Sequence, residues 1–200
     1  MTHEETDSQW VRRVQAGDVN AFEPLVERHQ KAIYNLLYRW LGDYDEAADV
    51  AQEVFLAAFG AIAQFRGEAK FSTWLYQIAI NHARNRRKQL AAKRPNLAPL
   101  DGDEAQEDGD PVARLPHPAP DAAQLMEQEE CARQIQLGLD QLPSDDALII
   151  VLHDLQGKSY DEIAELLQIP LGTMKSRLHR ARQALKIQLA PYHAALRSAR

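Results

Sequence analysis

QGKSYDEIAELLQIPLGTMKSRLHRARQALK, residues 156–186, is the stretch that decides the fold of this 200-residue chain. Ser159, with Glu162 three residues later, is a capping-box helix start, and apolar residues recur after it at helical spacing. Pro170 and Gly172 then interrupt the periodicity, and a second periodic run begins at once. The pattern predicts two helices joined by a tight turn, which is a helix-turn-helix.

The second predicted helix has one apolar and one polar face. Its apolar residues recur at spacings of four, three and four: Met174, Leu178, Ala181 and Leu185. A rotation of about 100° per residue puts a polar set on the opposite side: Ser176, His179, Arg180 and Gln183. Basic residues lie along the flanks: Lys175, Arg177, Arg182 and Lys186. Duplex DNA binding needs both base-edge and phosphate contacts, so this helix favours DNA binding over the alternative, an ordinary helical hairpin with a solvated basic face.

The charge of the chain is distributed unevenly. The net charge is −6, which argues against nucleic-acid binding if it is taken as a whole. Residues 1–95 carry 13 basic and 12 acidic side chains. Residues 96–142 carry 2 basic and 11 acidic side chains, and residues 143–200 carry 8 basic and 6 acidic side chains. The acidity is therefore local to the middle of the chain, and the two ends are slightly basic.

The composition excludes several classes of protein. Cys131 is the single cysteine, so neither an internal disulfide nor a multi-cysteine zinc site is expected. No nucleophile with its base and no phosphate-binding glycine loop is present, and we expect no enzyme activity, cofactor, metal or small-molecule substrate. The first ten residues are acidic and polar, unlike a signal peptide, and no apolar run approaches membrane-spanning length. We expect a cytoplasmic protein.

The periodicity along the chain predicts an all-α fold of two small domains. Helices are expected over residues 8–15, 20–40, 45–63 and 71–89 in the first domain (1–94). Helices over 121–141 and 144–155 precede the helix-turn-helix in the second domain (121–200). Between the domains, residues 95–120 contain six prolines and a run of acids, a composition typical of a flexible linker. The tail after Lys186 is expected to be a helix end.

Two faces of the first domain each leave two interpretations open. The helix over 45–63 has an outward stripe of Glu46, Asp49, Gln52 and Glu53, which read alone is most simply a solvated face. The helix over 71–89 gathers a second set on one side: Trp74, Gln77, Asn81, Arg84, Asn85 and Lys88. An exposed tryptophan beside amides and cations suits unpaired bases, but Trp74 could equally lie in the core.

Several blocks of residues resemble the bacterial sigma factors. Four blocks are similar to the second conserved region of that family: DVAQEVFL at 49–56, FRG at 65–67, FSTWLY at 71–76 and AIN at 79–81. Three further blocks are similar to the fourth conserved region: LP at 142–143, SYDEIA at 159–164 and GTMKSRLHRAR at 172–182. The blocks occur in the expected order with a linker in place of the third region, as in the extracytoplasmic-function (ECF) group. Leu171 and Met174 depart from the residues that are common in the family.

The resemblance implies a dissociable subunit that brings core RNA polymerase to promoters. It assigns docking on the clamp of the largest polymerase subunit to Asp45, Glu46, Asp49, Gln52 and Glu53. It assigns the melted strand of the −10 element to Arg66, Gly67, Lys70, Phe71, Trp74, Gln77, Asn81, Arg84 and Lys88. It assigns the duplex −35 element to Lys175, Ser176, Arg177, His179, Arg180 and Arg182. It also implies an anti-sigma partner, which in the family is often tethered to the membrane.

Two other functions remain open on the residues alone. One is a stand-alone helix-turn-helix regulator whose first domain binds a ligand or dimerises. The other is a module that only sequesters another transcription protein. A stand-alone repressor does not need the acidic stripe on the helix over 45–63 or the tryptophan, amides and cations on the helix over 71–89. A sequestering module does not need the outward basic residues of the last helix.

Overall fold

A computed structural model describes residues 6–93 and 122–198 of the chain, and the predicted linker at 95–120 lies outside the described residues. Within these ranges the structure is helical and contains no strand, which confirms the all-α prediction. The helices of the N-terminal domain are α1 (Asp7–Gln15), η1 (Val19–Phe22), α2 (Glu23–Leu41), α3 (Tyr44–Ala61), η2 (Ile62–Gln64) and α4 (Phe71–Lys93). Those of the C-terminal domain are α5 (Ala122–Asp140), α6 (Ser144–Ile150), η3 (Val151–Leu155), α7 (Tyr160–Leu167) and α8 (Leu171–Ser198).

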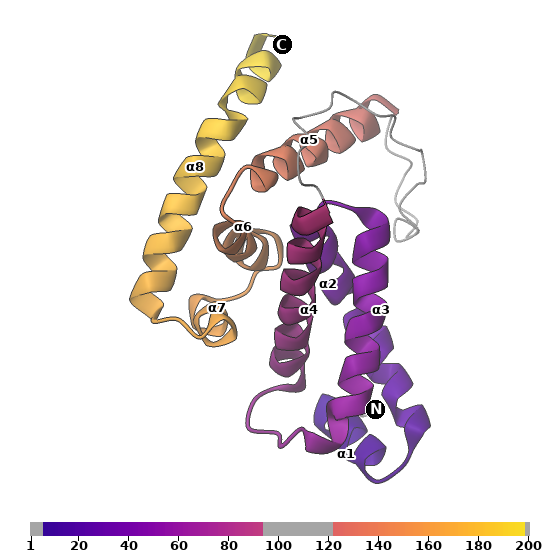
Figure 1. Cartoon of the computed structure of the whole chain (residues 1–200). Coiled ribbons are helices and arrows are strands. Elements are labelled where there is room, and N and C mark those ends of the chain that lie inside the picture. The colour runs from indigo at the N-terminus through magenta and orange to yellow at the C-terminus, as the bar shows by residue number, and fades with distance from the viewer. Residues whose placement is uncertain (1–5, 94–121, 199–200) are drawn as a thin grey trace, which may run out of the picture.

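The N-terminal domain is built on α2, α3 and α4, which pack side by side, with α1 across one end (Figure 1). Each helix contributes an apolar stripe to a common core, and the fully buried members include Leu25, Leu36, Trp40, Val54 and Leu75. Gly42 ends α2 in the left-handed conformation with φ +76°, which glycine adopts without a steric cost. The tight turn that it permits reverses the chain into α3.

The C-terminal domain contains the predicted helix-turn-helix. The side chain of Ser159 accepts a hydrogen bond from the Glu162 backbone N–H, and the Glu162 carboxylate accepts one from the Ser159 backbone N–H at 2.9 Å. This capping box starts α7, and Pro170 directly precedes α8. Met174, Leu178 and Ala181 are buried on one face of α8, and Ser176, His179, Arg180 and Gln183 are exposed on the other. The predicted faces of this helix are confirmed.

Several helix boundaries differ from the sequence prediction. The helix expected over 71–89 continues to Lys93, and the one expected over 45–63 changes to a 3₁₀ turn after Ala61. The helix expected from residue 20 begins at Glu23, after a 3₁₀ turn, because Pro24 suits the first turn of a helix. The helix expected over 144–155 changes at Val151 to a π-helical turn. The last helix continues through Pro191 to Ser198 instead of ending near Lys186.

Contact with α5 accounts for part of this longer α8. Gly138 on α5 lies so close to α8 that an added Cβ would stand 2.7 Å from Leu185 Cδ1 and 3.5 Å from Leu189 Cδ2. The missing side chain of Gly138 therefore lets the two helices approach, and the apolar contact extends α8 past the helix-turn-helix. No helix within the described residues is long and apolar enough to cross a bilayer.

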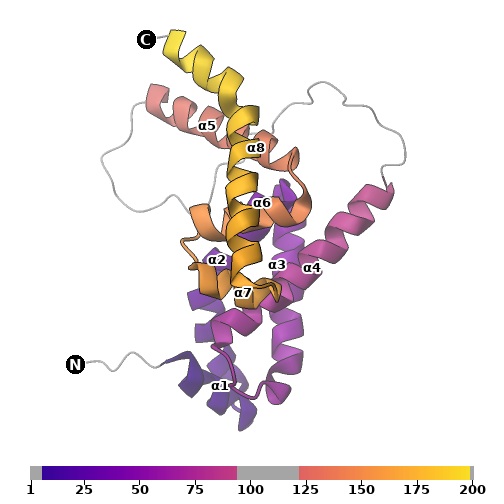
Figure 2. The same cartoon turned by 90° about the vertical axis from the view of Figure 1, so that its left-hand side faces the viewer.

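The two domains pack against each other, with α6 between α8 and α4 (Figures 1 and 2). Side chains donate to backbone carbonyls across the boundary. Trp40 Nε1 donates to the Ser144 carbonyl at 3.1 Å, Gln136 Nε2 to the Arg39 carbonyl at 3.2 Å and Gln156 Nε2 to the Ala32 carbonyl at 2.9 Å. The buried apolar residues of both domains also belong to one hydrophobic core cluster.

Loss of the capping box should destabilise the helix-turn-helix. Ser159→Ala should lower the free energy of unfolding by about 1 kcal/mol, measured by urea denaturation followed by circular dichroism. Hydrogen bonds from Ser159 hold the pKa of Glu162 below its ordinary value. The contribution of Glu162 is therefore present at neutral pH and should be lost as the pH falls through that lowered pKa. Equal stability of Ser159→Ala and the parent at pH 7 would contradict the capping role.

Candidate nucleic-acid and polymerase interfaces

The outer face of α8 carries most of the residues predicted for duplex DNA. Lys175, Ser176, His179 and Arg180 are exposed near the start of the helix. The Ser176 hydroxyl donates to the Thr173 carbonyl at 2.9 Å, so its oxygen remains available as an acceptor. The Lys175 ammonium lies 5.9 Å from the centre of the Tyr160 ring. The face therefore presents two cations, a hydroxyl and an imidazole to solvent.

Three arginines of α8 are held by carboxylates of the same domain. Arg177 lies 3.8 Å from Asp145, and Arg180 lies 3.6 Å from Asp146. Arg182 donates two hydrogen bonds to Asp154, and the first of these, from Nε, is 3.0 Å long. This partner raises the pKa of the Arg182 guanidinium. Arg182 thus has a firm intramolecular partner, whereas the Arg180 side chain remains 69% exposed.

An aromatic cluster lies at the start of α4, beside the loop that joins it to η2. The Trp74 ring is 5.0 Å from Phe65 and 5.7 Å from Phe71, centre to centre, and Trp74 is half-buried. Trp74 is therefore neither fully exposed nor wholly in the core, and its role toward unpaired bases stays a prediction. Phe71 is only 4% exposed and also packs against His29. Its side chain cannot touch a base in this conformation, since the helix start turns it into the core.

The loop before α4 and the polar side of α4 complete this face. Arg66, Gly67 and Lys70 are exposed, and Gly67 has φ +74°, a conformation that favours glycine. Arg66 makes only a loose ion pair with Glu68, at 4.0 Å. Farther along α4, Asn81 and Lys88 are exposed and Gln77 is half-buried.

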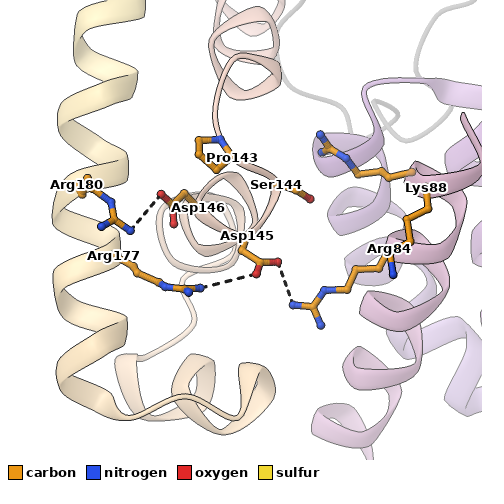
Figure 3. Close-up of a pocket in the computed structure, with 9 residues that line it drawn as sticks. Arg84, Lys88, Pro143, Ser144, Asp145, Asp146, Arg177 and Arg180 are labelled. Atoms are coloured by element: carbon orange, nitrogen blue, oxygen red, sulfur yellow. Dashed lines mark hydrogen bonds and ion pairs between the residues drawn. The ribbon is translucent and has the colours of Figure 1, made fainter. Parts of the chain in front are cut away.

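Arg84 of α4 faces α8 across a cavity of about 740 Å³ (Figure 3). Its guanidinium donates to Asp145 at 3.1 Å, and Asp145 also pairs with Arg177. Cations therefore line the cavity from both domains, and two carboxylates of α6 lie between them. The lining residues are Arg84, Arg87, Lys88, Pro143, Ser144, Asp145, Asp146, Arg177 and Arg180.

A second contact joins α4 to the segment before α7. The Lys158 ammonium lies 4.0 Å from the centre of the Tyr76 ring, a cation–π distance. Burial and the nearby Glu162 carboxylate raise the pKa of Tyr76 to about 12, and burial lowers the pKa of Lys158. The domain contact thus removes both groups from water.

The acidic stripe of α3 is divided between solvent and α4. Asp45, Asp49, Gln52 and Glu53 are exposed, and Glu46 is half-buried. Glu46 and Glu53 both accept hydrogen bonds from Arg86, the second at 2.7 Å. His82 also lies 3.3 Å from Glu53. The hydrogen bonds that Arg86 donates to the two glutamates raise the pKa of its guanidinium. The surface that remains open to a partner is therefore centred on Asp49 and Gln52, with Leu56 exposed one turn farther on.

Sequence reasoning missed the residues that connect these faces. Asp145 and Asp146 lie in the first turn of α6, where acids are favourable beside any helix N-terminus, so nothing in the pattern marked them as partners of DNA-facing arginines. No sequence pattern indicated the contacts that Arg86, Tyr76 and Lys158 make either. Within residues 6–93 and 122–198, no group of three or more His, Cys, Asp or Glu side chains could hold a metal ion.

A helix-turn-helix domain joined to a helical domain with an aromatic and cationic face defines a DNA-binding transcription protein. Residues 25–93 match the model of Sigma-70 region 2, and residues 132–185 match Sigma-70 region 4. The chain is 40% identical to the RNA polymerase sigma-H factor of Pseudomonas aeruginosa over 195 residues, covering 96% of this chain and 97% of the relative. It is 38% identical to the ECF RNA polymerase sigma-E factor of Escherichia coli K12 over 195 residues, covering 96% and 98%.

The chain belongs to the ECF group of the sigma-70 family, and is thus a transcription initiation factor. Its fold is similar to that of CnrH, solved in complex with the cytosolic domain of CnrY. That match has a TM-score of 0.66 and 23% identity, and covers 94% of this chain and 99% of the other.

Replacement of Arg86 tests whether Glu46 and Glu53 serve the fold. Arg86→Gln should lower the free energy of unfolding by about 1–3 kcal/mol, because it leaves hydrogen-bonded carboxylates without a charged partner. The matched control is Arg133→Gln on α5, where an exposed arginine pairs with Glu130 three residues away. Denaturant titration of both variants should show a change for Arg86→Gln alone. Equal stability of Arg86→Gln and the parent would return both glutamates to the candidate docking surface.

Proposed function

We propose that this chain binds core RNA polymerase and directs it to promoters, reading the −35 element with α8 and the melted −10 element with α4. The observation that carries the proposal is the placement of the predicted residues. A sigma-family chain carries an exposed acidic stripe on α3, a half-buried aromatic at the start of α4 and an exposed polar and basic face on α8.

The α8 surface supports duplex reading. Arg180, His179 and Ser176 can present donors and acceptors to base edges in the major groove, while Lys175 and Arg177 can reach phosphates. Arg182 is the weakest of the predicted contacts, because Asp154 already holds it with two hydrogen bonds.

The start of α4 supports capture of unpaired bases. Trp74 offers part of its ring for stacking, and Arg66, Lys70, Gln77, Asn81 and Lys88 can contact the strand beside it. Extruding a base costs a few kcal/mol, and stacking can return about 1–3 kcal/mol per base. Phe71 and Gly67 would act indirectly, Phe71 by supporting the Trp74 ring and Gly67 by shaping the loop.

The α3 stripe supports polymerase docking. Asp49 and Gln52, with Asp45 a turn earlier, are open to basic groups on a clamp helix, and Glu46 and Glu53 would stiffen the surface through Arg86. An anti-sigma protein that covers these surfaces would keep the chain inactive, and control of an envelope-stress or other stress regulon fits such a partner. The presence of a cytosolic partner domain on CnrH supports this part of the proposal. A cytoplasmic location of this chain is part of the proposal as well.

Transcription from purified components tests the proposal. Core RNA polymerase with the full chain should produce run-off transcripts from promoters of its own genome, and core polymerase alone should not. A chain that binds duplex promoter DNA tightly without polymerase, and never supports initiation, would instead be a stand-alone regulator.

Replacement of Arg180 should alter specificity more than stability, because its side chain is 69% exposed and only approaches Asp146, at 3.6 Å. Arg180→Ala should cost about 1–3 kcal/mol of discrimination at one base pair of the −35 element, the range for loss of one specific base contact. Lys175→Ala is the matched comparison and should weaken binding to all sequences alike, lowering the salt slope by about one. Fluorescence anisotropy with holoenzyme and a panel of −35 variants measures both effects. Unaltered sequence preference in Arg180→Ala would refute its assignment to a base.

Replacement of the open part of the α3 stripe should weaken docking. The double change Asp49→Ala and Gln52→Ala should raise the Kd for core polymerase roughly two- to tenfold, the range expected for two exposed polar contacts. Glu27→Ala, an exposed acid on α2, controls for loss of charge and should leave the Kd unchanged. Titration of labelled chain with core polymerase gives the Kd values. If both variants bind as the parent does, the stripe is only a solvated face.

A further inference from the structure

The loop before α4, residues 66–70, is held at both ends by α1. Gln15, the last residue of α1, donates from Nε2 to the Ile62 carbonyl at 2.8 Å and to the Phe65 carbonyl at 2.9 Å. These carbonyls stand at the start of η2 and directly after its end. One side-chain amide therefore bridges η2 and fixes the backbone of Phe65, the residue that leads into the loop.

The other end of the loop is held through the first residue of α1. Asp7 accepts a hydrogen bond from Arg28 at 2.7 Å, and its second oxygen lies 2.8 Å from Nε2 of His29. The His29 side chain is only 12% exposed. Its ring centre lies 5.6 Å from that of Phe71, the first residue of α4. Asp7 thus fixes the ring against which the start of α4 packs.

Both contacts converge on the half-buried Trp74. The Phe65 ring lies 5.0 Å from Trp74 and 6.0 Å from Phe71, centre to centre, and the Phe71 ring lies 5.7 Å from Trp74. The three rings therefore pack as one cluster, and a shift of either phenylalanine changes the surface that Trp74 presents. Between the two phenylalanines the loop is mostly exposed, so its shape depends on where its two ends are placed.

We propose that Gln15 and the Asp7–His29 pair are positioning residues for base capture, and that α1 acts through them as a brace for the loop and the aromatic cluster. The brace rests on the proposed function, because it acts on the face assigned there to unpaired bases. A site that already has the shape its ligand needs loses less entropy on binding than a mobile one. A base that leaves the duplex thus meets a loop and a ring that are already in place, and the promoter opens faster.

The docking of α1 does not depend on these polar contacts. Val11 and Val14 are 3% and 9% exposed, and they hold α1 to the core of the domain. Gln15 is itself exposed, and both of its bonds end on carbonyls that precede the loop. Loss of its amide should therefore free the loop and leave the domain folded.

Two substitutions each release one end of the loop. Gln15→Met keeps the length and the helix propensity of the side chain and removes the donor to both carbonyls. His29→Phe keeps a ring beside Phe71 and removes the contact with Asp7. Gln30→Met is the matched control, since Gln30 is an exposed glutamine of the same domain.

Limited trypsin digestion of the free, full-length chain tests whether α1 holds the loop. Trypsin cuts after Arg66 and Lys70 more readily when the loop opens locally, and mass spectrometry separates these cuts from cuts elsewhere. Gln15→Met and His29→Phe should raise the rate of cutting at the loop about three- to tenfold, as expected when an open minor state becomes more populated. Gln30→Met should leave that rate at the parental value, and cutting within α8 should not change in any variant.

Promoter opening by the complete holoenzyme tests the role of the brace in base capture. Core polymerase is saturated with each variant and mixed with a duplex promoter on which the parent initiates, with a dye beside the melted region. The dependence of the fluorescence rate on holoenzyme concentration separates the affinity of initial binding from the rate of opening. Gln15→Met and His29→Phe should slow opening about three- to tenfold, because misplaced contacts slow a reaction step, and should leave the initial affinity and the Kd for core polymerase unchanged. A chain that is merely destabilised would form less holoenzyme and keep the parental rate of opening.

Unchanged cutting at the loop in Gln15→Met would overturn the brace. Faster cutting with an unchanged rate of opening would overturn it as well, because the loop would then be held without effect on base capture. Equal losses of initial affinity and of opening rate would indicate general damage to the domain and would also contradict it. A parent that never opens a promoter refutes the proposed function and with it the role in base capture, while the digestion still shows whether α1 holds the loop.

Discussion

The packing of α6 is the constraint on which the arrangement of the molecule depends. Its apolar residues Leu148, Ile149 and Ile150 are buried, and it lies between α8 and α4 (Figure 2). Its first residue, Ser144, accepts a hydrogen bond from Trp40, a core side chain of the other domain that is 1% exposed. The same short helix therefore supports the recognition helix, completes the polar pairing of the N-terminal core and carries the carboxylates that meet arginines of both domains.

Local features of the sequence were sufficient to predict the recognition helix. Its apolar period places Met174 and Leu178 in the core whatever the rest of the chain does, so the opposite face must be outward. The capping box at Ser159 is equally local. The boundaries were less predictable where they depend on contacts, as at the end of α8, where Gly138 of α5 determines how closely Leu185 can pack. Pro191 lies inside α8 and does not end the packed helix.

For the candidate sites, the sequence predicted which side chains share one face of a helix, but not which contacts those side chains make with other helices. The period of α3 correctly turned Asp49 and Gln52 outward, but it could not show that Arg86 of α4 holds Glu46 and Glu53. The pattern of α4 turned Trp74 to one side, yet the burial of Phe71 follows from how the helix start meets His29 and Phe65. Contacts between domains, such as Arg84 with Asp145, carry no periodic signal, because they depend on docking between distant segments.

These contacts also reconcile an acidic chain with DNA recognition. A cation that is free in solution gains the full benefit of counterion release when it meets a phosphate. An arginine that must first leave Asp145 or Asp146 exchanges one anion for another, so its net gain is smaller. The ion pairs therefore reduce the net gain that Arg177 and Arg180 can obtain from a phosphate, even though the outer face of α8 is basic.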